Sequence, residues 1–245
     1  VVEHAREKGI ELGLWFHPSN ADDYANWEKD VQVVTNLYKN FDVRYFKIDG
    51  IKLPTKKAEI NLRKFLDAVQ KASNGEVVFN LDATADNRGG YHYFYEYGNI
   101  FLENRYTDFG RYYPHWTLRN LWMLSAYVPP ENLQIEFLNK WRNESKYEKG
   151  DPLAPANIPF DYQFAVTMMA QPLAWFEGSN LPEEAFEIAP IVKKYRELQP
   201  DIHSGKILPI GDEPSGTSWT GFQSIKNDGT GYVLVLREYN DCNTA

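Results

Sequence analysis

The 245 residues predict an α/β fold: a (β/α)8 barrel of the TIM type that lacks its first two βα units and leads into the start of an all-β domain. Two observations support this prediction. Short apolar runs alternate with longer stretches of helical period throughout the first 200 residues, as in parallel strands joined by helices. Each run is almost continuously apolar, which is typical of strands buried on both faces. An open doubly wound sheet is the alternative, but no glycine-rich phosphate loop follows any run.

The apolar runs and their connections give the expected order of elements. Six strands are expected, at residues 11–17, 43–49, 76–82, 99–103, 133–139 and 172–178. Amphipathic helices should follow Asn20, Thr55 and Pro182, and another should end within residues 1–9, where no start signal precedes it. Because a closed barrel has eight βα units, we expect the two missing units to precede Val1.

The C-terminal part changes in character. Residues 218–225 and 231–240 look like strands, and the turn-rich sequence KNDGTG joins them. The expected division is therefore a partial barrel domain over residues 1–205 and the beginning of a β-sandwich domain over residues 206–245.

Composition excludes several classes of function. The 26 Lys and Arg residues are scattered, and the net charge is -8, so nucleic acid is not an expected partner. No run approaches the roughly 18 to 20 apolar residues of a membrane span. The single cysteine, Cys242, allows no internal disulfide and leaves the compartment open, with a periplasmic or secreted location favoured over the cytoplasm. No residues are grouped at metal-ligand spacing, so neither a metal nor a cofactor is expected.

Polar residues end the expected strands, at the end of a barrel where active sites form. They are His17, Asp49, Asp82, Glu103, Glu136 and Glu177. Five of the six are carboxylates, and two carboxylates about 5 to 5.5 Å apart are what retaining glycoside hydrolysis requires. Trp15, two residues before the end of its strand, offers a face on which a sugar ring can stack. The pattern predicts a glycoside hydrolase.

A specific motif adds a family resemblance. The sequence YFKIDG, with Lys47 and Asp49, resembles the K-x-D strand of the α-galactosidases of glycoside hydrolase families 27 and 36. GLWFHPS at residues 13–19 is similar to the third-strand sequence of family 36, and FNLDATADNRGGY resembles its fifth-strand loop. The resemblance implies that Asp49 ends the fourth strand and is the catalytic nucleophile.

The resemblance also implies the other roles. It places Glu103 at the acid/base position with Asp108 as the rival; Glu103 is preferred because it ends the apolar run, whereas Asp108 lies beyond Arg105 in an expected loop. Sugar binding is expected from six residues: Trp15, His17, Lys47, Asp82, Arg88 and Arg105.

The implied activity is exo-acting cleavage of a terminal α-galactoside, or a related α-glycoside, with retention. The alternatives are a transglycosylase of the same clan and a catalytically inactive barrel that binds carbohydrate. The expected partner is an oligosaccharide or glycoside substrate. A second copy of the chain could also cover the open edges of a partial barrel, which would make a homo-oligomer.

Overall fold

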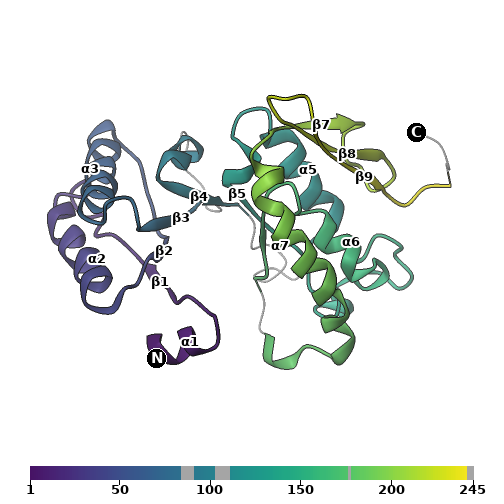
Figure 1. The fold of residues 1–245 in the computed structure, drawn as a ribbon, viewed down its shortest axis with the longest axis horizontal. Coiled ribbons are helices and arrows are strands. Elements are labelled where there is room, and N and C mark those ends of the chain that lie inside the picture. The colour runs from purple at the N-terminus through teal and green to yellow at the C-terminus, as the bar shows by residue number, and fades with distance from the viewer. Residues whose placement is uncertain (84–90, 103–110, 176–177, 242–245) are drawn as a thin grey trace. The chain divides into compact units, whose positions relative to one another are not determined.

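In the computed structural model, residues 1–83, 91–102, 111–175 and 178–241 are described, apart from the side chains of residues 92, 93 and 179. They belong to two compact units, Val1–Phe101 and Leu102–Ala245, which we describe separately (Figure 1).

The first unit alternates helices and parallel strands. Strands β1 to β4 are paired in sequence order, each parallel to the next. The elements are α1 (Val2–Glu7), β1 (Gly13–Phe16), α2 (Trp27–Phe41), β2 (Tyr45–Ile48), α3 (Lys56–Ala72), β3 (Val78–Asp82), the 3₁₀ helix η1 (Tyr91–Tyr97) and β4 (Gly98–Phe101).

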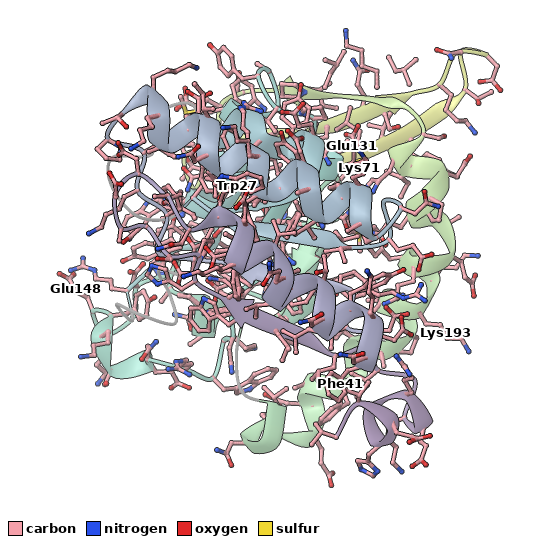
Figure 2. All side chains as sticks on the ribbon, turned by 90° about the vertical axis from the view of Figure 1, so that its left-hand side faces the viewer. Trp27, Phe41, Lys71, Glu131, Glu148 and Lys193 are labelled. Carbon is pink, nitrogen blue, oxygen red and sulfur yellow. The ribbon has the colours of Figure 1, made fainter. Side chains whose placement is uncertain are left out.

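Helices α2 and α3 pack against each other and cover one face of these strands. Figure 2 shows the two helices side by side, with Trp27 at the start of α2 and Phe41 at its end. Phe65 of α3 lies between Phe16 and Phe79, with ring centroids 5.9 and 6.0 Å apart. Since side chains alternate between the two faces of a strand, the residues next to these phenylalanines face the other way. That other face carries the candidate site.

The second unit contains two further parallel strands and a small antiparallel sheet. Strands β5 and β6 are parallel to each other, and β7, β8 and β9 form the antiparallel sheet in that order. The elements are α5 (Pro114–Leu124), η2 (Pro130–Asn132), β5 (Leu133–Glu136), η3 (Glu144–Lys146), η4 (Pro155–Asn157), α6 (Phe160–Ala165), β6 (Gln171–Leu173), η5 (Gly178–Asn180), η6 (Glu183–Ile188), α7 (Ala189–His203), β7 (Lys206–Gly211), β8 (Trp219–Ile225) and β9 (Gly231–Arg237).

The prediction of six parallel strands that alternate with helices is confirmed, and so is the hairpin at the C-terminal end. The strands within the described residues do not close into a barrel. One expected boundary is wrong: β6 ends at Leu173 rather than near Glu177, because the apolar residues Ala174 and Trp175 continue the run outside the strand. No helix within the described residues is long and apolar enough to cross a membrane.

Candidate active site

The register of the first three strands brings Trp15, Lys47 and Asp82 to one face of the sheet. Trp15 is opposite Lys47, and Lys47 is opposite Asn80. Asp82 lies two residues beyond Asn80 on the same strand, so its side chain points to the same side. Phe46, Ile48 and Leu81, which alternate with Lys47 and Asp82 along β2 and β3, are fully buried. The polar face is therefore opposite the face covered by the helices.

Lys47 and Asp82 form a buried ion pair. The Lys47 ammonium donates a hydrogen bond to Oδ2 of Asp82, and the two side chains are 10% and 3% exposed. Few charged side chains are buried to this extent, and those that are usually have a partner of opposite charge. The pair therefore fixes a cation at a defined point of this face.

Two aromatic rings flank that cation. The Lys47 nitrogen lies 4.5 Å from the ring centroid of Trp15 and 4.3 Å from that of Phe101, within the range of a cation–π interaction. Phe101 is fully buried, whereas Trp15 is 61% exposed. The Trp15 ring is thus held by the lysine and is still accessible to solvent, as a stacking platform for a sugar would be.

Asp49 follows β2 directly and is only half-buried. Its backbone N–H donates to the carbonyl of Phe16 at 3.1 Å, which continues the parallel ladder one step beyond the strand. Its carboxylate oxygen Oδ1 accepts a hydrogen bond from the N–H of Gly50 at 2.6 Å. Asp49 and Lys47 are two residues apart, so both side chains leave the chain on the polar face.

Gly50 allows the chain to turn away after Asp49. Its φ of +68° lies in the left-handed region that glycine adopts readily, and a Cβ atom at this position would overlap the imidazole ring of His17. His17, directly after β1, therefore packs over the turn that carries Asp49. The residue type at position 50 is required both by the backbone conformation and by the lack of space.

His17 also lies near an acidic group on α2. Asp30 accepts a hydrogen bond from the N–H of Ser19 at 3.0 Å. Burial raises the pKa of Asp30, while the Ser19 amide and the nearby His17 act in the opposite direction. The segment between β1 and α2 is thus anchored close to the site.

The remaining predicted residues divide into two groups. Glu103, Arg105, Asp108, Arg88 and Glu177 lie outside the described residues. Glu136 ends β5 as expected and is 1% exposed. Within the part of the chain that the structure describes, no three His, Cys, Asp or Glu side chains are grouped as metal ligands.

Sequence reasoning missed three features of the site: the role of Phe101, the ion pair between Lys47 and Asp82, and the packing of His17 over Gly50. Phe101 and the ion pair depend on strand register, which the apolar runs do not specify. The glycine directly after Asp49 was a visible signal for the tight turn.

The arrangement suits a ligand rich in hydroxyl groups. A half-buried carboxylate, a fixed ammonium and an accessible indole ring share one face at the ends of parallel strands. Charged groups bind hydroxyls strongly, and an aromatic ring packs against the C–H face of a sugar.

Comparison with known proteins gives a match at the level of structure. No protein-family model matches the chain, and no curated protein matches it by sequence. Among solved structures, the family 36 α-galactosidase AgaA from Geobacillus stearothermophilus matches with a TM-score of 0.72 at 13% sequence identity, covering 100% of this chain and 39% of that one. A variant of that enzyme solved with raffinose matches with a TM-score of 0.69, also at 13% identity, and the same shares of the two chains are covered.

A second α-galactosidase also matches this chain in structure. The galactosidase domain of the α-galactosidase-sucrose kinase AgaSK matches with a TM-score of 0.70 at 13% identity, covering 100% of this chain and 38% of that one. The fold of this chain is therefore that of a region of the family 36 α-galactosidases. The chain spans well under half the length of these relatives.

Proposed function

We propose that the protein is a retaining exo-α-glycosidase that cleaves terminal α-galactosides, with Asp49 as the nucleophile. One observation carries the proposal: the aspartate of the K-x-D motif follows β2 directly, half-buried and on the same face as Lys47 and Trp15. The likeness of the whole chain to α-galactosidases supports it at the level of fold. In this proposal, the six parallel strands are strands three to eight of a (β/α)8 barrel, and residues 206–245 begin a β-sandwich domain.

The proposed reaction has two steps. The Asp49 carboxylate attacks the anomeric carbon while the acid, Glu103 or its rival Asp108, protonates the glycosidic oxygen, so that the aglycone leaves and a glycosyl ester forms. The acid, Glu103 or Asp108, is now a carboxylate and takes a proton from a water molecule. That water attacks the anomeric carbon and releases Asp49, and the two inversions together retain the configuration.

The first unit contributes the binding surface. Trp15 would stack on the sugar ring from its exposed side, and Lys47 would donate to sugar hydroxyls while Asp82 holds it in place. His17 and Arg88 are further proposed contacts from this part of the chain, and Arg105 is a proposed contact from the second unit. An oligosaccharide with a terminal α-galactose, of the kind bound by the relative solved with raffinose, is the proposed substrate.

Kinetics of Asp49→Asn test the proposal. An amide is a poor nucleophile, so kcat for an aryl α-galactoside should fall by on the order of 10³-fold or more. Asp22→Asn is the matched control, because the Asp22 side chain is 78% exposed and pairs only with Lys57 among the described residues. Proton NMR of the first product should show the α-anomer. If Asp49→Asn hydrolyses the substrate as fast as the wild type does, the proposal is wrong. If the wild type binds sugar but does not hydrolyse it, the alternative of a catalytically inactive, carbohydrate-binding barrel is supported instead.

A further inference from the structure

The second unit contains a cavity that the proposed function does not use. It has a volume of about 450 Å³, within the range of small-molecule sites, and lies between the start of α5, residues 150–162 and the end of β9. Much of its wall is apolar. The apolar lining residues are Pro114, Pro152, Leu153, Ile158 and Pro159.

A buried carboxylate lines this cavity. Oxygen Oε2 of Glu238 accepts three backbone hydrogen bonds, from the N–H groups of Ser215 at 2.9 Å, Gly216 at 2.7 Å and Ser218 at 2.8 Å. The residue is 8% exposed, and its other oxygen, Oε1, is buried without a hydrogen-bond partner among the described residues. A buried carboxylate oxygen without a donor is unfavourable, so a ligand that donates a hydrogen bond to Oε1 would remove this cost.

Two further groups on the cavity wall interact with Glu238. Burial lowers the pKa of His115, and the charge of Glu238 acts against that shift. The imidazole is therefore mainly neutral at pH 7 and presents one donor and one acceptor nitrogen. Burial and the Glu238 charge both raise the pKa of Tyr162, which keeps its phenol protonated as a donor. The cavity thus combines a charged acceptor with two neutral polar groups.

The charges on the wall favour a neutral ligand. The charge of Glu238 is already stabilised by three backbone N–H groups, so the ligand need not supply a positive charge, and an anion would meet the carboxylate. The Arg237 guanidinium lies over the ring of Trp219, 5.9 Å from its centroid. A neutral molecule with several hydroxyl groups and an apolar C–H face matches the polar groups and the proline-rich wall together.

We propose that this cavity is a non-catalytic binding site for a pyranose sugar, with one sugar hydroxyl donating to Oε1 of Glu238. The site is non-catalytic because Glu238 is the only carboxylate among the residues that line the cavity, whereas retaining hydrolysis needs two. The inference rests on the second unit alone and does not depend on the role of Asp49.

Substitution Glu238→Gln tests the site with little change in shape. Its carbonyl can still accept the three backbone N–H groups, but an NH₂ donor replaces the acceptor Oε1. The protein is titrated with methyl α-galactopyranoside and, separately, with methyl α-glucopyranoside. NMR follows the ring resonances of His115, which are assigned by their absence from the spectrum of His115→Gln. The wild type should show a saturable shift with at least one of the sugars, and Glu238→Gln should bind at least about tenfold more weakly.

The controls separate this cavity from the rest of the protein. Glu213→Gln removes an exposed carboxylate that interacts with Arg119 and should bind sugar as the wild type does. If Glu238→Gln does not fold, Tyr162→Phe, which loses only a hydroxyl, should weaken binding about threefold. His115 resonances that do not shift with either sugar would overturn the proposal. Equal sugar binding by the wild type and by folded Glu238→Gln would also overturn it. So would a shift with tetramethylammonium or sulfate in a protein that shows no shift with either sugar. Loss of hydrolysis alone would bear only on Asp49.

Discussion

Asp82 in the first unit and Glu238 in the second are both buried carboxylates, but they are held in different ways. Asp82 is 2% exposed and interacts with the ammonium of Lys47. Glu238 is 8% exposed, and one of its oxygens accepts three backbone N–H groups. A salt bridge requires both charges, whereas backbone N–H groups can also donate to a neutral carbonyl oxygen, although these hydrogen bonds are weaker. The two sites should therefore respond differently to loss of charge.

The largest stability difference is expected between Asp82→Asn and Glu238→Gln. Asp82→Asn removes the buried negative charge that the Lys47 ammonium contacts and should lower the free energy of unfolding by about 3 kcal/mol. Glu238→Gln keeps an acceptor for the backbone and should cost about 1 kcal/mol. Urea denaturation of both variants measures the difference.

A double-mutant cycle sharpens this contrast. In the Lys47→Met background, Asp82→Asn should cost much less, because the ammonium that interacts with Asp82 is already absent. Equal costs for Asp82→Asn in the two backgrounds would show that the ion pair does not stabilise the first unit. A cost for Glu238→Gln as large as that for Asp82→Asn would remove the distinction between the two carboxylates.

A smaller difference in the cost to stability is expected between alanine substitutions of two glycines, one in each unit. Gly50 and Gly216 both have positive φ, +68° and +93°. An added Cβ at Gly50 would overlap the His17 ring, whereas at Gly216 it would lie 2.9 Å from a methyl group of Leu153, which can move. Gly50→Ala should cost about 2 kcal/mol and Gly216→Ala about 1 kcal/mol, as measured by thermal unfolding. If His17→Gly does not reduce the cost of Gly50→Ala, the overlap is not its cause.

The sequence predicted much of the fold because buried strands have a strong local signal. Each expected strand overlaps an observed one, and Asp49 directly follows a strand, as the YFKIDG motif indicated. Strand ends were less predictable, since Trp175 is as apolar as a strand residue but lies beyond β6.

The contacts of the two sites were not predictable from local pattern. Lys47 and Asp82 are 35 residues apart and meet only because β2 and β3 pair in one register. Glu238 follows an ordinary strand sequence, and the turn that supplies its donors is 20 to 23 residues earlier. Such pairings depend on tertiary structure, which propensity and periodicity do not encode.

Trapping of the intermediate tests the central claim most directly. A 2-deoxy-2-fluoro-α-galactosyl donor with a good leaving group should form a stable ester with the nucleophile, because the fluorine slows the second step more than the activated first step. Peptide mapping by mass spectrometry should find the fluorosugar on Asp49. Hydrolytically active protein that carries the label on another carboxylate would contradict the assignment of Asp49 as the nucleophile.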